Sequence, residues 1–158
     1  PGKGRRMITV WGGQTSRSIR VVWLLEEMGM PYSVRQVDML APEQDPEFLA
    51  INPADYIPAM QDDDVVMVES IAIMEYLAET HPEHAIWPKD RAARAMARAI
   101  ASEMHAGFSG IRGACPMNLG KRFAEKDRGT TVARDAARVQ EIWRTARERF
   151  GQGGPSAR

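Results

Sequence analysis

The order of strand-like and helix-like segments in the first eighty residues is the feature that most constrains the fold. Apolar periodicity predicts strands over 7–11, 32–37, 57–60 and 65–68, and helices over 19–28, 47–51 and 71–79. Gly29 is a natural stop for the first helix, Asp45-Pro46 starts the second, and Ser70 caps the third. The order β-α-β-α-β-β-α predicts a compact α/β domain.

The first of these helices follows a loop rich in hydroxyl side chains. Thr15, Ser16 and Ser18 are all residue types that cap helix N-termini. The helical spacing of the segment after them predicts an apolar stripe made of Ile19, Val22, Trp23 and Leu25.

The chain changes character after residue 80. Pro82 and Pro88 indicate a linker over 81–90, and the stretches 91–112 and 131–150 are long, Ala- and Arg-containing helical patterns. Residues 113–129 predict a break with a short helical piece inside it. Two long helices cannot each bury an apolar stripe against a single neighbour. They therefore dock on the first domain, dimerise, or belong with further helices that this chain lacks.

Composition excludes several function classes. The 21 basic and 21 acidic residues balance, so the overall charge offers no attraction to nucleic acid or an anionic membrane. One cysteine builds no disulfide framework, no apolar stretch is long enough to span a bilayer, and the basic start lacks the apolar run of a secretory signal. We therefore expect a cytoplasmic protein. The three histidines lack the spacing of a metal site, so no metal is expected.

Three segments carry a family resemblance. Residues 15–29 (TSRSIRVVWLLEEMG), 52–59 (NPADYIPA) and 68–77 (VESIAIMEYL) resemble, in order and spacing, the glutathione-binding half of cytosolic glutathione S-transferases of the bacterial, serine/threonine type. Residues 103–108 and 116–118 are similar to the second domain of one bacterial branch. The resemblance covers 7 to about 155 and breaks off where family members continue with more helices, so the second domain is expected to be truncated.

The resemblance implies a fold and an activity. It implies a thioredoxin-like glutathione-binding domain at 7–80, a linker at 81–90, and a partial all-helical domain at 91–158. The implied activity is attack of the glutathione thiolate on a hydrophobic electrophilic small molecule, with glutathione as co-substrate and a homodimer as the assembly. The same resemblance is compatible with a rival: a non-enzymatic glutathione-binding or interaction module, inactive through truncation.

The resemblance also implies site residues. A hydroxyl at a helix N-terminus favours a bound thiolate, and the family patterns match either Ser16 or Thr15, which we leave open. No cysteine lies in this loop, and Cys115 belongs to the other domain, which argues against redox or cysteine-type chemistry.

The remaining site residues are expected to hold the tripeptide. Ser70 and its helix end are expected to face outward and hold the γ-glutamyl carboxylate, with Glu69 meeting the ammonium. Ile57-Pro58 resembles the family's cis-proline turn, which presents backbone groups to the cysteinyl part of glutathione. Gln44 stands where family members often carry a cation for the glycyl carboxylate.

Overall fold

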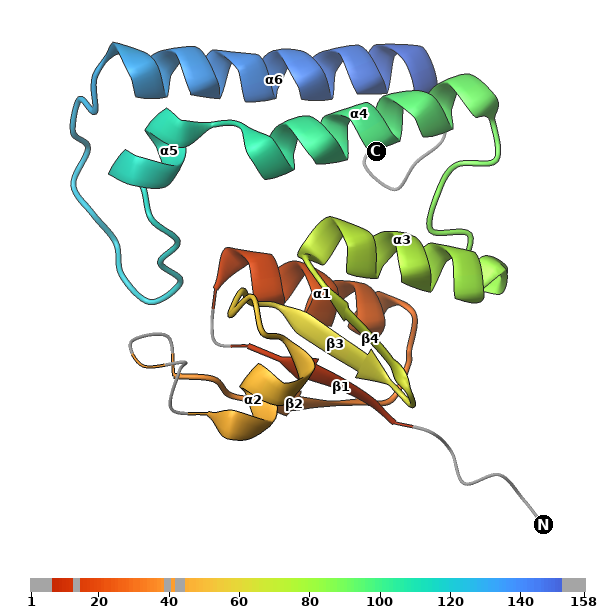
Figure 1. Ribbon diagram of the computed structural model, residues 1–158. Coiled ribbons are helices and arrows are strands. Elements are labelled where there is room, and N and C mark those ends of the chain that lie inside the picture. The colour runs from red at the N-terminus through yellow and green to blue at the C-terminus, as the bar shows by residue number, and fades with distance from the viewer. Residues whose placement is uncertain (1–6, 13–14, 39–40, 42–44, 152–158) are drawn as a thin grey trace. The chain divides into compact units, whose positions relative to one another are not determined.

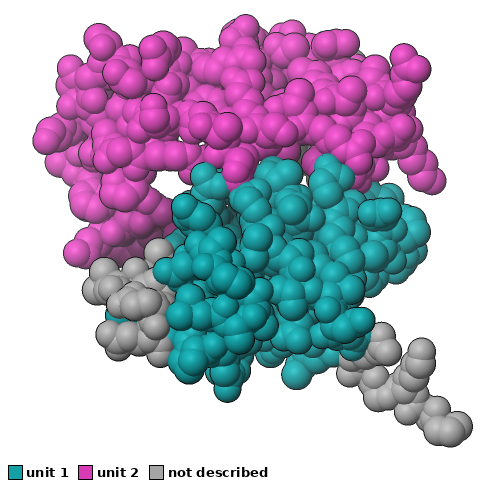
Figure 2. Space-filling model, viewed as in Figure 1, with its two compact units in different colours: residues 1–86 teal, residues 87–158 magenta. Residues whose placement is uncertain are grey.

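The computed structural model describes residues 7–12, 15–38, 41 and 45–151. The chain divides into two compact units, residues 1–86 and residues 87–158, which Figure 2 distinguishes by colour. The first unit has thioredoxin-like α/β architecture and the second is helical. Among the described residues, no helix is both long and apolar enough to traverse a bilayer.

A four-stranded mixed sheet forms the centre of the first unit. Its strands are β1 (Ile8–Trp11), β2 (Tyr32–Arg35), β3 (Ala59–Asp62) and β4 (Val65–Val68). They are ordered β2-β1-β3-β4; β1 is parallel to β2 and antiparallel to β3, and β3 is antiparallel to β4. The register pairs Trp11 with Ala59, which brings the end of β1 beside the start of β3.

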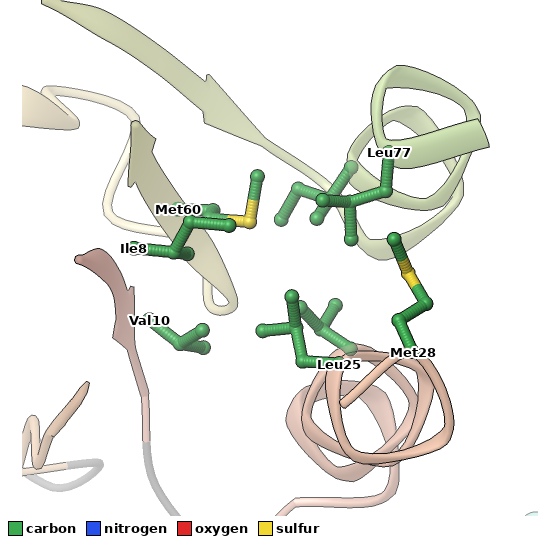
Figure 3. Close-up of a cluster of buried hydrophobic side chains, with 8 residues drawn as sticks. Ile8, Val10, Leu25, Met28, Met60 and Leu77 are labelled. Carbon is green, nitrogen blue, oxygen red and sulfur yellow. The ribbon is translucent and has the colours of Figure 1, made fainter. Parts of the chain in front are cut away.

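Two layers of apolar side chains cover the sheet. Helices α1 (Ser16–Glu27) and α3 (Ser70–Thr80) lie on one face, and the short α2 (Pro46–Ile51) lies on the other (Figure 1). Successive strand residues point to opposite faces. The layer beneath α1 and α3, shown in Figure 3, consists of Ile8, Val10, Val21, Leu25, Met28, Met60, Ile73 and Leu77. The layer beneath α2 consists of Trp11, Val37, Phe48 and Ala59.

Two details of the first unit correct the sequence predictions. Helix α1 begins at Ser16, three residues earlier than predicted, and its buried apolar face consists of Val21 and Leu25, continued by the C-cap residue Met28. Trp23, which we expected in the apolar stripe, is 65% exposed, and its indole Nε1 donates to Glu27. The buried residues are spaced four and three apart, so they share one face of the helix.

The second unit consists of α4 (Arg91–Ala106), α5 (Ser109–Ala114) and α6 (Thr130–Phe150). The prediction of one helix over 91–112 is wrong, because Gly107 ends α4 and Phe108 adopts a left-handed conformation with φ 63°. The short helical piece predicted within 113–129 lies instead at 109–114, and residues 115–129 form no helix or strand.

The total charge of the chain is neutral, but basic and acidic residues are unequally distributed between the two units. Residues 1–86 contain 6 basic and 14 acidic residues, whereas residues 87–158 contain 15 basic and 7 acidic residues. The helical unit is therefore basic and the α/β unit acidic.

Candidate functional site

The first turn of α1 contains the two hydroxyls that the sequence left undecided. Thr15 is the N-cap of α1; its Oγ1 accepts from the backbone N–H of Ser18 at 3.2 Å and lies 3.0 Å from the Ser18 Oγ. The Thr15 hydroxyl oxygen thus caps the start of the helix. Ser16 is the first helical residue and is half-buried, and its side chain makes no hydrogen bond within the described residues. The Ser16 hydroxyl is therefore available to donate a hydrogen bond to a polar group of a ligand.

A glycine brings the neighbouring segments close to this turn. Gly12 follows β1 with φ 154°, and a Cβ placed on it would lie 2.6 Å from the Ser18 Oγ and 3.6 Å from the Ile57 Cβ. The end of β1, the first turn of α1 and the segment before β3 therefore meet at Gly12. The missing side chain is what permits this approach.

The peptide bond between Ile57 and Pro58 is cis, as the resemblance implied. Asn52, which is 2% exposed, donates from its Nδ2 to the carbonyl of Tyr56 and so holds the segment that leads into this bond. Within the described residues, neither the N–H nor the C=O of Ile57 has a hydrogen-bond partner. These two groups form an open backbone edge beside the start of α1.

Glu69 organises the N-terminus of α3. Its backbone N–H donates to the Pro58 carbonyl at 3.2 Å, and its φ of 78° folds the side chain back over the helix end. Oε2 accepts from the N–H of Ile71 at 3.0 Å, and Oε1 accepts from the Ser70 hydroxyl at 3.2 Å. Glu69 rather than Ser70 is therefore the N-cap, which corrects the sequence prediction.

Ser70 also differs from its expected setting. We expected its hydroxyl to face outward, but Ser70 is fully buried and its hydroxyl donates to Glu69. The carboxylate of Glu69, and not the Ser70 hydroxyl, caps the start of α3. An anion is stabilised beside the first N–H groups of a helix.

An ion pair that the sequence did not reveal joins the two helix starts. The guanidinium Nη1 of Arg17 lies 3.4 Å from the Glu69 Oε1, and the two side chains are 40% and 44% exposed. The pair links residues 52 positions apart in the chain. The signal available in sequence was only an arginine directly after Ser16, which by itself is typical of a solvent-exposed helix surface.

Gln44 lies outside the described residues. The nearest described residues, Ala41 and Asp45, help to line an open cavity of about 390 Å³. Its other lining residues are Arg35, Asp38, Pro46 and Glu47. In the part of the chain that the structure describes, no group of three or more His, Cys, Asp and Glu side chains is arranged to hold a metal ion. Cys115 is a free thiol in the helical unit.

Comparisons with known proteins find similar sequences. Residues 7–79 match the family model "Glutathione S-transferase, N-terminal domain". A probable maleylacetoacetate isomerase of Caenorhabditis elegans is 37% identical over 102 residues, which are 65% of this chain and 47% of the relative. The glutathione S-transferase GstB of Escherichia coli K12 is 37% identical over 99 residues, 58% of this chain and 46% of the relative. The chain thus spans about half the length of the curated relatives it matches.

A solved structure extends the likeness to both units. The theta class glutathione S-transferase of Xanthomonas axonopodis pv. citri, solved with glutathione bound, has a TM-score of 0.63 and 27% identity. The match covers 93% of this chain and 72% of that protein.

Proposed function

Because residues 7–79 belong to the glutathione S-transferase N-terminal domain family, we propose that this chain binds glutathione and promotes attack of its thiolate on an electrophilic small molecule. The observation that carries the proposal is the convergence of three segments. The start of α1, the Ile57-Pro58 turn and the start of α3 meet through the contacts of Gly12 and the hydrogen bond from Glu69 to Pro58. Solved relatives with glutathione bound support the choice of ligand.

Ser16 is our choice for the group that stabilises the thiolate. A thiolate is favoured by a hydroxyl that donates to it and by the positive end of a helix. The Thr15 hydroxyl is held by two contacts with Ser18, whereas within the described residues the Ser16 side chain makes no hydrogen bond. The thiolate then attacks the electrophilic carbon, the new C–S bond forms, and the leaving group departs with its electron pair. This reaction needs no metal ion.

The rest of the tripeptide would lie along the open backbone edge. The N–H and C=O of Ile57 suit strand-like pairing with the cysteinyl residue. Glu69 would meet the ammonium of the γ-glutamyl group, with Ser70 and the start of α3 beside its carboxylate. We keep Gln44 as the residue proposed for the glycyl carboxylate.

Isothermal titration with glutathione, run beside conjugation of an activated aryl halide, tests the proposal. We expect saturable binding and turnover in the unmodified protein. Ser16→Ala should raise the pKa of the bound thiol by about 1–2, the effect of losing a hydrogen bond to a charged group. Thr15→Ala should instead destabilise the fold by about 1 kcal/mol through loss of the cap. A folded protein that binds no glutathione would refute the function.

A glutathione-binding module without catalysis is the second candidate. The contacts proposed for Ile57 and Glu69 would serve it equally, because neither residue acts on the thiol. Saturable glutathione binding with no turnover of any electrophile would support it against the enzyme.

We propose a cytoplasmic homodimer as the assembly. The acidic α/β unit of one copy and the basic helical unit of another carry opposite charges, which favours association of copies. Sedimentation at low salt should then show a dimer that weakens at about 1 M salt, where the screening length falls to about 3 Å. A monomer at low salt would contradict this assembly.

A further inference from the structure

We propose that residues 115–129, which connect α5 to α6, dock this chain on the anionic surface of a phospholipid membrane. Leu119 and Phe123 insert among the lipid chains, and the neighbouring cations lie at the level of the headgroups. The inference does not depend on glutathione binding. It would place the proposed transferase at the phase into which hydrophobic electrophiles partition.

The α5–α6 connection presents apolar side chains to solvent. It forms no helix or strand, and all of residues 116–129 are exposed. Figure 1 shows it as a long loop between the two helices. Leu119 is 88% exposed, Phe123 64% and Met117 45%. Single exposed apolar side chains are common on protein surfaces, but these three lie together on one short segment and indicate an interaction surface.

A side-chain cap holds the turn that carries Leu119. The Oδ1 of Asn118 accepts from the backbone N–H groups of Gly120 at 3.1 Å and Lys121 at 2.9 Å. Leu119 lies inside this turn and is the most exposed large apolar side chain among the described residues. Because the turn belongs to the connection, inserting Leu119 requires no unfolding of α5 or α6.

Cations alternate with the apolar side chains along the same segment. Lys121, Arg122 and Lys126 are exposed, and within the described residues none of them makes a hydrogen bond or an ion pair. The fourth cation, Arg128, donates to the carbonyl of Ala114. The segment contains four basic and two acidic residues, so its charge favours an anionic partner.

A lipid surface matches both features of the segment. Its headgroups carry negative charge, and its acyl chains accept apolar side chains without a shaped pocket. Insertion of Leu119 and Phe123 brings Lys121 and Arg122, which lie between them in the chain, to the headgroups, and long basic side chains extend readily toward phosphates. An acidic protein would also supply the charge, but it would need a pocket fitted to each apolar side chain.

The neutral total charge of the chain does not prevent this attraction. At physiological salt a charge acts over about 8–10 Å, so an anionic surface responds mainly to the residues that it meets. The helical unit that contains the segment has 15 basic and 7 acidic residues. The total charge, which argued against an anionic membrane as a partner, is therefore not the charge that this unit presents.

Co-sedimentation of the full chain with lipid vesicles tests the proposal. At about 0.1 M salt we expect binding to phosphatidylcholine vesicles that contain about one-third phosphatidylserine, and little binding to phosphatidylcholine alone. Binding should weaken at least about tenfold at about 1 M salt, where the screening length falls to about 3 Å.

Two adjacent aromatic–arginine pairs provide a matched comparison. Arg122→Gln with Phe123→Ser should weaken binding about 50-fold, of which about fivefold comes from the cation and about tenfold from the apolar side chain. Trp143→Ser with Arg144→Gln makes the same kind of change on α6 and should leave binding unchanged. This control is matched in exposure, because Phe123 and Trp143 are both 64% exposed.

Leu119→Trp gives a separate measure of insertion. Lipids that are brominated in their acyl chains should quench the fluorescence of this variant more strongly than that of the unmodified protein. If the variant changed at Arg122 and Phe123 fails to fold, as judged by circular dichroism, the Leu119→Trp result decides the question.

Four outcomes would overturn the proposal. They are the absence of binding to anionic vesicles by the folded protein, equal binding to both kinds of vesicle, equal losses in the two double variants, and no added quenching in Leu119→Trp. Binding to polyglutamate without binding to anionic vesicles would assign the segment to an acidic protein instead. Self-association that is lost in the Arg122 and Phe123 variant, again without vesicle binding, would assign it to a second copy of this chain.

Discussion

Asp135 of α6 provides a sharp test of how the helical unit is held together. It is buried, with 7% of its surface exposed, and its Oδ2 accepts from the backbone N–H groups of Gly110 at 2.9 Å and Ile111 at 3.2 Å. These are N–H groups of the first turn of α5, and the N-cap residue Phe108 offers no side-chain acceptor. A residue 24 and 25 positions away therefore caps this helix.

The magnitude follows from the two hydrogen bonds. Asp135→Ala removes both, and a hydrogen bond to a charged group contributes about 1.5 kcal/mol or more. The loss of both hydrogen bonds would cost about 3 kcal/mol. Water that reaches the half-buried Gly110 and Ile111 lowers this cost to about 2 kcal/mol. Asp135→Asn keeps an oxygen that can accept from both N–H groups, so it should cost about 1 kcal/mol.

Hydrogen exchange at the α5 amides measures this effect directly. The N–H groups of Arg112 and Cys115 donate to Phe108 and Ile111, so their protection reports the integrity of α5. A cost of 2 kcal/mol corresponds to about 30-fold faster exchange in Asp135→Ala. The matched control is Asp127→Ala, because within the described part of the chain the exposed Asp127 accepts only from Gly129. Equal exchange at these α5 amides in the two variants would refute the argument that burial makes the cap costly.

Three further predictions concern the first unit. Burial, followed by the hydrogen bond to a nearby aspartate, raises the pKa of Tyr76 from 10.0 to about 12. The neutral Tyr76 hydroxyl therefore contributes to the free energy of unfolding fully below pH 10, and this contribution is lost as the pH rises through about 12. Denaturant unfolding of Tyr76→Phe should lack this loss. Gly12→Ala should destabilise the fold by about 1–3 kcal/mol, because its Cβ would lie 2.6 Å from a buried hydroxyl. Gly113→Ala in α5 has open space around it and should stabilise the fold by about 0.5–1 kcal/mol. A similar change in the free energy of unfolding of both variants would contradict the steric account. Phe48→Ala should cost about 3–5 kcal/mol in thermal or denaturant unfolding because Phe48 is fully buried under the sheet, and a loss below 1 kcal/mol would show that α2 contributes little to the fold.

Local signals in the sequence were sufficient for the order of the elements and for several of their ends. Asp45 caps α2 as predicted, with the predicted proline in its first turn, and α6 begins within one residue of its predicted start. The hairpin arm at 65–68 was predicted residue for residue. Capping, proline geometry and period-two alternation depend on residues within a few positions of one another. These helix starts and this strand can therefore be predicted from the local sequence alone.

The site was predicted as a set of segments but not as a set of contacts. Ser16, the Ile57-Pro58 turn and the Glu69-Ser70 step were all named from sequence. The capping role of Glu69, the burial of Ser70 and the ion pair to Arg17 were not. The ion pair in particular depends on the starts of α1 and α3 lying close together, which the local sequence does not show.

What the sequence determined by itself was therefore which stretches become strands and helices and which hydroxyls and carboxylates begin them. Only the tertiary structure decided which face of α1 is buried, where the helix predicted over 91–112 divides, and that Asp135 of α6 closes the start of α5. The break at Gly107 and Phe108 is stabilised by Asp135 from another helix, just as the start of α3 is tied by Glu69 to Arg17. The physical reason is that a polar group's partner is selected by distance in space, and residues far apart in the chain become neighbours only when the chain folds.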